Sequence, residues 1–275
     1  MAGKTDYKNN LCFLKLGGSI ITDVDKPDTP NIEAIRRLSI ELKESLSDGM
    51  KLIVGHGSGS FAHVPAHRYQ THMGRINEDS MKGAVITHHA ARRLNEIVME
   101  NMIEIGIDAL SFSPSSAAMA EDKKVISWNT DPIEKALGFG FVPIIYGDVL
   151  VDLKQGFCIA STEELFRALA LKLRPKRIII GTDVDGVFDS DPKQNKNAKL
   201  IRSIGKEELE YLLPRTTSSR KFNVTGSMNS KIQLLYETSE NTGAECQILN
   251  AAADGRVRDA LKGKHVESTI IKSLA

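Results

Sequence analysis

The segment from His56 to His63 reads HGSGSFAH and follows the apolar residues Leu52 to Val54. Gly57 and Gly59 carry no Cβ, so both can adopt positive φ, and the small residues around them let successive backbone N–H groups converge on one anion. His63 ends the segment with a side chain that can donate a hydrogen bond and carry a positive charge. This stretch predicts a phosphate-binding loop after a buried strand, although a histidine in a loop can also serve no ligand.

A second glycine-rich element, LKLGGSIIT, occupies Leu14 to Thr22. Its apolar start predicts a strand, and Gly17, Gly18 and Ser19 predict the turn that follows. Lys15 places an ammonium group beside that turn. Two anion-binding loops so close together in the sequence indicate two phosphorylated ligands, or the two ends of a group transfer.

The composition is that of an ordinary globular protein. The chain has 275 residues, 41% of them hydrophobic, which suffices for one large α/β domain or two closely packed lobes. Its 36 basic and 35 acidic residues give a net charge of +1, so we expect no nucleic-acid partner. Isolated Cys12, Cys158 and Cys246 predict free thiols in a reducing cytoplasm. We expect no secretory signal in MAGKTDYKNN and no membrane association, since no apolar run is long enough to span a bilayer.

Short apolar runs alternate with longer amphipathic segments along the chain. The runs are continuously apolar, which is typical of strands covered on both faces, so we predict an α/β protein with a mainly parallel sheet. A proline near Arg174–Lys176 marks a possible boundary between two lobes. The expected strands are 12–16, 51–54, 109–112, 142–146, 177–180, 245–249 and 268–271; the expected helices are 31–47, 80–105, 162–173, 206–212 and one that ends near 241.

Two lysines are candidates for a phosphate clamp. Lys15 lies inside an apolar strand, where a lysine is seldom buried without a partner; the alternative is an edge-strand lysine that reaches water. Lys231 lies five residues after Gly226, at the start of a predicted helix, where free N–H groups and aligned peptide dipoles favour anions. Taken alone, Lys231 would be interpreted as a surface residue.

The segment TDVDGVF, from Thr182 to Phe188, places two carboxylates and a glycine after a predicted strand. The ends of strands are where ligands bind in open α/β sheets. Its carboxylates can bind a metal, accept hydrogen bonds from a ribose or base, or form turns. The spacing does not match a calcium-binding EF-hand, and the histidines show no zinc-binding spacing, so we expect no metal bound by the protein itself.

Six motifs together resemble the amino acid kinase superfamily and, within it, the isopentenyl phosphate kinases. The resemblance extends from about residue 11 to 272, and the subfamily is indicated by His63, because these kinases end their second glycine-rich loop with a histidine, in the form HGGGSFGH. The motifs are KLGGS at 15–19, HGSGSFAH at 56–63, YGDV at 146–149, STEE at 161–164, TDVDGVF with a following DP at 182–192, and TGSMNSK at 225–231.

This resemblance implies a fold and a reaction. The fold is a three-layer αβα sandwich, a single amino acid kinase domain over 1–275 with an acceptor-binding lobe at 11–174 and a nucleotide-binding lobe at 175–275. The reaction transfers the γ-phosphoryl group of ATP, with Mg²⁺ carried by the nucleotide, to isopentenyl phosphate. Its product, isopentenyl diphosphate, would serve isoprenoid precursor synthesis in an alternative mevalonate route. The resemblance also implies a homodimer.

The family's functional positions carry over residue by residue. Lys15 and Lys231 would hold the transferring phosphoryl group and Lys26 would stabilise the transition state. His63 would bind the acceptor phosphate, and Glu163 would organise the lysines. The implied nucleotide contacts further include Gly17, Gly18, Ser19, Ser58, Thr182, Asp183, Asp185, Gly186, Val187 and Gly226. The implied acceptor contacts further include Gly57, Ser58, Gly59, Ala84, Thr87, Gly147, Val149, Ile159 and Ser161.

The chain departs from the family pattern at three positions. Ser58 and Ala62 stand where the family usually has glycine, which raises the question of whether the backbone can adopt the required φ values. Glu163 stands where the family's SGD triplet has aspartate, so the charge is kept and one methylene is added. We expect activity to survive with a shifted geometry.

Two other functions remain open on the same fold. One is a kinase for another small phosphate or phosphonate, such as a fosfomycin-type compound or a nucleoside monophosphate. The apolar residues around Met81–Thr87 favour a prenyl group instead, and the small Ala84 leaves room for a longer one. The other is a non-catalytic nucleotide-binding sensor, against which the presence of both Lys15 and Lys231 argues.

Overall fold

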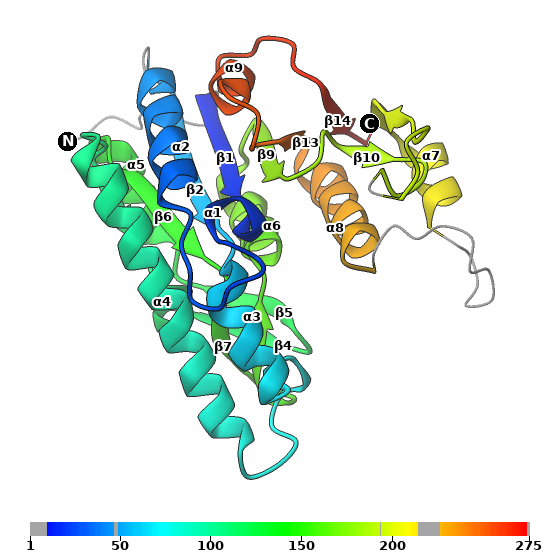
Figure 1. Ribbon diagram of the computed structural model, residues 1–275. Coiled ribbons are helices and arrows are strands. Elements are labelled where there is room, and N and C mark those ends of the chain that lie inside the picture. Colours follow the sequence, from blue (N-terminus) through cyan, green and yellow to red (C-terminus); the bar gives the residue numbers. More distant parts are fainter. Residues whose placement is uncertain (1–9, 47–48, 193, 214–225, 274–275) are drawn as a thin grey trace.

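The computed structural model describes residues 10–46, 49–192, 194–213 and 226–273 (Figure 1). The N-terminal segment 1–9 and Thr225 of the expected nucleotide motif lie outside the described residues. The fold is built on an eight-stranded sheet with the order β12-β14-β13-β9-β1-β2-β6-β3. Its strands are β1 (Leu11–Leu16), β2 (Lys51–His56), β3 (Ala109–Ser111), β6 (Val142–Tyr146), β9 (Arg177–Thr182), β12 (Ser203–Ile204), β13 (Glu245–Asn250) and β14 (Ser268–Ile271).

Every neighbouring pair in this sheet is parallel except β13 and β14, so the predicted, mainly parallel sheet is confirmed. The central strand β1 is buried on both faces, as its unbroken apolar sequence predicts. Leu11 and Phe13 belong to one hydrophobic cluster and Cys12, Leu14 and Leu16 to another. The sheet therefore separates two cores.

Helices cover both faces of the sheet and complete the expected three-layer sandwich. The helices are α1 (Gly18–Ile21), α2 (Ile32–Ser45), α3 (Gly59–Arg68), α4 (Ser80–Glu104), α5 (Asp131–Phe139), α6 (Thr162–Leu173), α7 (Lys206–Leu212), α8 (Gly226–Thr242) and α9 (Arg256–Leu261). Residues of α2, α4 and α9 share the core of one face, and residues of α5, α6, α7 and α8 share the core of the other. Figure 1 shows α2 and α4 side by side along one flank.

A second sheet was not predicted. It has the order β5-β4-β7-β8, with β4 (Ala118–Glu121), β5 (Lys124–Trp128), β7 (Asp148–Asp152) and β8 (Gly156–Ala160), and it lies beyond the carboxyl end of β6. Its strands are short and alternate between buried and exposed positions, so they lack the continuous apolar run on which the prediction relied. The pair β10 (Val187–Phe188) and β11 (Leu200–Ile201) forms a further small ribbon.

No helix in the described part of the chain is long and apolar enough to cross a membrane. The three cysteines are free and buried, as predicted. Burial raises the pKa of Cys12 to about 12, so its thiol stays protonated at neutral pH. We expect Cys12 to act as a small core residue and not as a nucleophile.

Candidate active site

The two glycine-rich segments lie against each other. Strands β1 and β2 pair in parallel, with Leu16 opposite His56, so both chains leave the sheet at the same edge. A Cβ on Gly18 would lie 2.5 Å from the backbone nitrogen of Gly59, and a Cβ on Gly57 would lie 2.9 Å from that of Gly18. Only glycine permits this backbone-to-backbone contact, which brings the two predicted anion-binding elements into one site.

The loop within the segment HGSGSFAH is shorter than the sequence suggested. Helix α3 begins at Gly59, so His63 lies in a helix and not in a loop. Gly59 has φ +46°, whereas Gly57 is not among the residues with positive φ. Ser58 has φ −89° and ψ −9°, a conformation open to any residue, and Ala62 lies inside α3. Both departures from the family's glycines are therefore compatible with the backbone.

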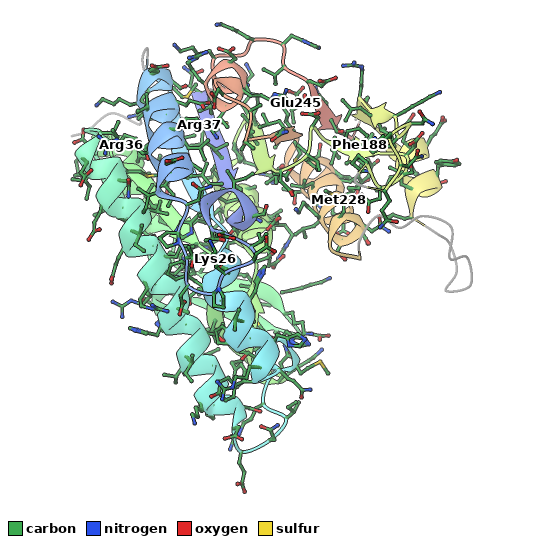
Figure 2. The ribbon with its side chains drawn as sticks, in the orientation of Figure 1. Lys26, Arg36, Arg37, Phe188, Met228 and Glu245 are labelled. Carbon is green, nitrogen blue, oxygen red and sulfur yellow. The ribbon has the colours of Figure 1, made fainter. Side chains whose placement is uncertain are left out.

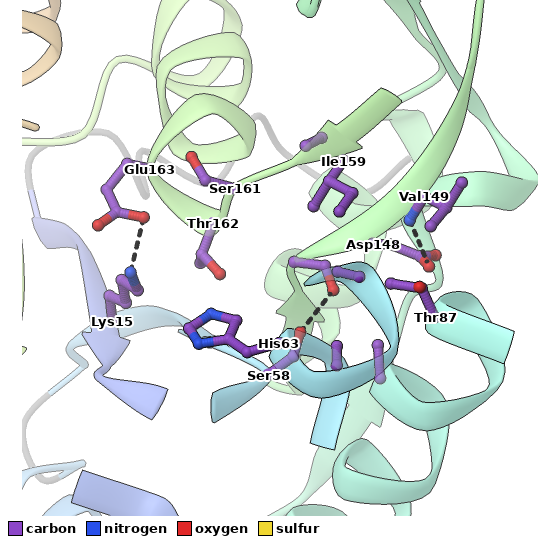
Figure 3. Close-up of a pocket in the computed structure, with 16 residues that line it drawn as sticks. Lys15, Ser58, His63, Thr87, Asp148, Val149, Ile159, Ser161, Thr162 and Glu163 are labelled. Carbon is purple, nitrogen blue, oxygen red and sulfur yellow. Dashed lines mark hydrogen bonds and ion pairs between the residues drawn. The ribbon is translucent and has the colours of Figure 1, made fainter. Parts of the chain in front are cut away.

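A cavity of about 140 Å³ opens beside these loops (Figure 3). One end carries charged and polar side chains, including Lys15, His63 and Glu163. The other end is bounded by small and apolar side chains. The residues that line the cavity are Lys15, Gly57, Ser58, Ala62, His63, Ala66, Thr87, Ala91, Gly147, Asp148, Val149, Ile159, Ala160, Ser161, Thr162 and Glu163.

Glu163 joins the two candidate lysines. Its Oε2 lies 2.6 Å from Nζ of Lys15, and its Oε1 lies 3.6 Å from Nζ of Lys231 (Figure 3 shows the first contact). The side chains of Lys15 and Glu163 are only 12% and 7% exposed. Glu163 lies in the first turn of α6, whose N-cap Ser161 accepts a hydrogen bond from the backbone of Glu164. The side chain of Glu163, one methylene longer than the aspartate of the family pattern, thus reaches both lysines.

The charges of this cluster depend on one another. Burial alone would raise the pKa of Glu163, but the adjacent Lys15 and Lys231 outweigh that effect and hold its pKa at about 2. Burial lowers the pKa of Lys15, and the carboxylate of Glu163 opposes that shift. The carboxylate is therefore ionised at neutral pH and keeps two cationic groups beside the cavity.

His63 faces the same cavity from α3. Burial, and next the positive charge of Lys15, lower its pKa, so the imidazole is neutral at neutral pH in the unliganded protein. An anion bound between His63 and Lys15 would reverse the electrostatic balance and favour the imidazolium. This end of the cavity is suited to an anion and not to a metal cation.

A model of the amino acid kinase family matches residues 10–250 of this sequence. This chain belongs to the amino acid kinase family. It is 34% identical over 272 residues to an isopentenyl phosphate kinase of Methanothermobacter thermautotrophicus, covering 95% of this chain and 98% of the relative. A protein of the same name from Methanocaldococcus jannaschii is 33% identical, with the same coverage.

Solved structures agree with this family assignment. One, described as X-ray structures of isopentenyl phosphate kinase, superposes with a TM-score of 0.83 at 31% identity and covers 95% of this chain and 100% of its own. The product complex of the Thermoplasma acidophilum isopentenyl phosphate kinase superposes with a TM-score of 0.77 at 27% identity, with the same coverage. A UMP kinase from Ureaplasma parvum, at 17% identity and a TM-score of 0.68, shares the fold.

The apolar end of this amino acid kinase's cavity includes most of the predicted tail contacts. Thr87 of α4 lines it together with Val149 of β7 and Ile159 of β8. Ala84, which was predicted to contact the acceptor, lies one helical turn before Thr87, is buried, and is not among the residues lining the cavity. Ala62, Ala66 and Ala91 line the cavity but were not predicted to contact the acceptor. Small residues spaced four apart, as in Ala62/Ala66 and Thr87/Ala91, could have indicated helix faces that leave room for a ligand.

Ala160, Thr162 and Asp148 also line the cavity without having been predicted, and Asp148 is the charged one. Its buried carboxylate accepts hydrogen bonds from the backbone of Val149 at 2.8 Å and lies 2.7 Å from Nδ1 of His88. The hydrogen bond with Asp148 raises the pKa of His88. The pair connects α4 to β7, which are two walls of the cavity. Only the YGDV motif marked Asp148 in the sequence, and that motif does not identify its partner.

The predicted nucleotide contacts lie at the carboxyl ends of β1 and β9 and at the start of α8. A Cβ on Gly17 would lie 2.6 Å from the carbonyl oxygen of Gly181, so the first glycine loop also contacts β9. Ser19 lies in the single turn α1, next to Gly18. Thr182 ends β9 and hydrogen-bonds the carbonyl of Val184 at 2.9 Å. Asp183 follows it in the loop, and Gly226 is the first residue of α8.

Two predicted residues have partners outside the cavity. The carboxylate of Asp185 is held by Arg256 and by Asn250 at 3.3 Å, and Val187 donates a backbone hydrogen bond to Thr269 at 2.8 Å. Gly186, between them, would bring a Cβ within 2.4 Å of Oγ1 of Thr269. These contacts hold the TDVDGVF loop against β13 and β14.

Lys26 is placed apart from the other candidate catalytic residues. It lies in the loop after α1 (Figure 2), its side chain is 72% exposed, and its Nζ lies 3.3 Å from Oδ2 of Asp23. It does not line the cavity. The structure therefore brings together Lys15, His63, Glu163 and Lys231, and leaves Lys26 on the surface.

Proposed function

We propose that this protein is an isopentenyl phosphate kinase, which transfers the γ-phosphoryl group of ATP to isopentenyl phosphate and releases isopentenyl diphosphate and ADP. The observation that carries the proposal is one cavity with two ends: Lys15, His63 and Glu163 line one end, with Lys231 3.6 Å from Glu163, and apolar side chains line the other. A prenyl phosphate has the matching division into an anionic head and an apolar tail. The names of the relatives at 34% and 33% identity support the same assignment.

The acceptor would bind with its phosphate at the start of α3. In the described part of the chain, the backbone N–H groups of Ser58 and Gly59 donate no hydrogen bond to protein. Ser58 lines the cavity, so its N–H would bind phosphate oxygens together with the imidazole of His63, and the N–H of Gly59 follows it at the start of α3. The five-carbon tail would then extend between α3 and α4 toward Val149 and Ile159.

Transfer would proceed by direct displacement. The second pKa of a phosphate monoester is about 6, so the acceptor oxygen is anionic at neutral pH and needs no general base. That oxygen forms a bond to the γ-phosphorus, the bond between γ-phosphorus and the bridging oxygen breaks, and its electron pair leaves with ADP. Lys15 and Lys231 would neutralise the charge on the transferring group, while Glu163 holds them in place.

ATP would bind at the carboxyl ends of β1 and β9, with phosphates at Gly17, Gly18 and Ser19. The remaining nucleotide contacts would be Ser58, Thr182, Asp183, Asp185, Gly186, Val187 and Gly226. The glycine backbone and the two lysines are a donor set suited to phosphate oxygens. Mg²⁺ would arrive on those oxygens, as it commonly does, and would supply further charge neutralisation. In this arrangement residues 11–174 form the acceptor lobe and residues 175–275 the nucleotide lobe.

We place the enzyme in the cytoplasm as a homodimer. Three buried free thiols support a reducing compartment. The dimer is proposed from the resemblance to the family and is testable by light scattering.

A panel of acceptors tests the proposed function. With ATP-Mg, we expect rapid ADP release on isopentenyl and dimethylallyl phosphates and none above background on fosfomycin or uridine monophosphate. The apolar end of the cavity accounts for this order, since neither of the latter compounds offers a prenyl tail. Geranyl phosphate measures how much longer a tail fits. Turnover confined to fosfomycin or uridine monophosphate would replace the proposed acceptor, and no turnover on any acceptor would favour a nucleotide sensor.

His63→Ala should lower kcat/KM for isopentenyl phosphate by about tenfold to a thousandfold, the range for loss of one charge-stabilising donor. Because bound phosphate favours the imidazolium of His63, acceptor binding takes up a proton, and the wild-type KM should rise as the pH is increased above 6.5. His63→Gln keeps a hydrogen-bond donor but cannot titrate, so its KM should not change over the same pH range. An unchanged rate in His63→Ala would remove this residue from the site.

A further inference from the structure

His56 is a buried polar residue that the proposed reaction does not use. It is the last residue of β2, its side chain is fully buried, and its ring stacks on Tyr146 with centroids 5.6 Å apart. Nδ1 lies 3.1 Å from the carbonyl oxygen of Gly57, and Nε2 lies 3.2 Å from Oδ1 of Asn95. A histidine here is costly to bury unless its ring nitrogens find partners, and each has a polar atom within hydrogen-bond distance.

The tautomer of His56 follows from its partners. Burial lowers the pKa of His56 despite its two hydrogen bonds, so the ring is neutral and carries one N–H. The backbone carbonyl of Gly57 can only accept, whereas the side-chain amide of Asn95 can be turned to present its nitrogen, so we assign this hydrogen to Nδ1, which donates it to Gly57. The structure places Oδ1 of Asn95 toward Nε2, and Nδ2 of Asn95 donates to the hydroxyl of Ser111, 2.9 Å away. Turned by 180°, the same amide donates from Nδ2 to Nε2, and its Oδ1 accepts from the hydroxyl of Ser111.

The bond to the Gly57 carbonyl fixes a peptide that faces the acceptor site. The Gly57–Ser58 peptide bond is trans, as are all peptide bonds among the described residues, so the carbonyl of Gly57 and the N–H of Ser58 point in opposite directions across one planar unit. Because the carbonyl points to the buried ring of His56, the N–H of Ser58 points away from it. That N–H has no protein acceptor in the described part of the chain, and Ser58 lines the cavity.

Other contacts tie the same loop to the sheet. The hydroxyl of Ser58 donates to the carbonyl of Gly147 at 3.2 Å, and the backbone N–H of Gly147 donates to the carbonyl of His56 at 3.1 Å. These contacts hold both ends of the Gly57–Ser58 peptide but do not fix the rotation of the peptide plane between them. That rotation depends on the partner of the Gly57 carbonyl. Glycine at 57 makes that rotation easy, so a specific partner for the carbonyl is needed to prevent it.

We propose that His56 is a positioning residue for the acceptor: through Nδ1 it holds the Gly57–Ser58 peptide so that the N–H of Ser58 is aimed at the acceptor phosphate. The proposal rests on the function proposed above, because it gives that N–H a phosphate to bind. His56 itself touches neither substrate and exchanges no proton with either.

Three substitutions of His56 distinguish the roles of its two ring nitrogens. The amide nitrogen of asparagine occupies about the place of Nδ1, whereas that of glutamine occupies about the place of Nε2, and leucine fills the volume without donating. We expect KM for isopentenyl phosphate to rise about tenfold or more in His56→Leu and His56→Gln, and by no more than about threefold in His56→Asn. A tenfold change corresponds to about 1.4 kcal/mol, which is typical of a hydrogen bond to a charged group.

Several readouts distinguish this role from simple core packing. KM for ATP should stay within about twofold in all three variants, and the pH dependence attributed to His63 should persist. Asn95→Leu, which removes only the support of Nε2, should give a smaller rise in the acceptor KM with the same selectivity. Melting temperatures identify variants that fail to fold. If His56→Leu fails to fold, the difference in acceptor KM between His56→Asn and His56→Gln tests the proposal.

Equal damage in His56→Asn and His56→Gln, or a parallel rise in both KM values, would overturn the proposal. Binding of inorganic phosphate, measured by calorimetry on the same proteins, separates this outcome from failure of the proposed function. If the wild type does not phosphorylate isopentenyl phosphate, the acceptor is wrong. The order of phosphate affinities, with the wild type and His56→Asn above His56→Gln and His56→Leu, still tests the role of His56.

Discussion

Lys15→Met should lower kcat by at least about a thousandfold on the preferred acceptor. Lys15 lies at the junction of the two glycine-rich loops, where its Cε would be 3.8 Å from a Cβ on Gly57. A preorganised cation on a transferring phosphoryl group contributes about 10³–10⁵ to the rate. Methionine keeps the unbranched stem but removes the charge. ADP release under saturating ATP-Mg and acceptor measures the effect, and a loss of less than tenfold would remove Lys15 from the transfer step.

Stability provides the matched control for this substitution. Lys15→Met leaves Glu163 with Lys231 alone, at 3.6 Å, so the free energy of unfolding should also fall. Adding Glu163→Gln to Lys15→Met removes the uncompensated carboxylate and should restore part of that stability without restoring activity. Lys15→Arg keeps the charge in a different geometry, and we expect it to remain well below the wild-type rate.

Glu163→Gln should lower kcat by about a hundredfold to a thousandfold, although Glu163 does not react. The substitution removes the charge that holds Lys15 and Lys231 in one cluster, so the two ammonium groups repel each other and lose their orientation. Glu163→Asp restores the side chain of the family's pattern with one methylene fewer. We expect it to retain more activity than the glutamine variant, because the charge is kept.

The same residue should appear in the pH dependence of stability. The pKa of Glu163 is lowered from 4.5 to about 2, so its ionised form stabilises the folded state above about pH 4.5, and this contribution is lost as the pH falls toward 2. Urea unfolding of the wild type between pH 6 and pH 3 should therefore show a steeper loss of stability than Glu163→Gln. Equal slopes would mean that the cluster does not stabilise the carboxylate.

The sequence predicted the parts of the site that local chemistry determines. A lysine in an apolar strand, a glycine pair after it and a histidine after a second glycine-rich run were enough to indicate phosphate binding. The central strands were equally clear, and helices 162–173 and 206–212 have the predicted bounds. In each case the signal lay within one segment of the chain.

What the sequence did not predict depends on contacts between distant segments. Glu163 was recognised as a departure from a motif, but only the fold shows that its two oxygens reach Lys15 and Lys231. The pairing of Asp148 with His88, across 60 residues, has no local signature. Helix α3 was interpreted as a loop because glycine and serine at its start concealed the helical residues that follow.

The continuous central sheet has a mechanical consequence. Strand β1 of the proposed acceptor lobe and β9 of the proposed nucleotide lobe are paired in register from Cys12–Arg177 to Leu16–Gly181, so the two halves share one hydrogen-bonded ladder. A hinge that swung them apart would have to break that ladder in the middle of the core. Substrate entry and product release must therefore rely on sheet twist and on movement of the surrounding loops, and turnover should respond more to loop substitutions than to changes near residues 174–176.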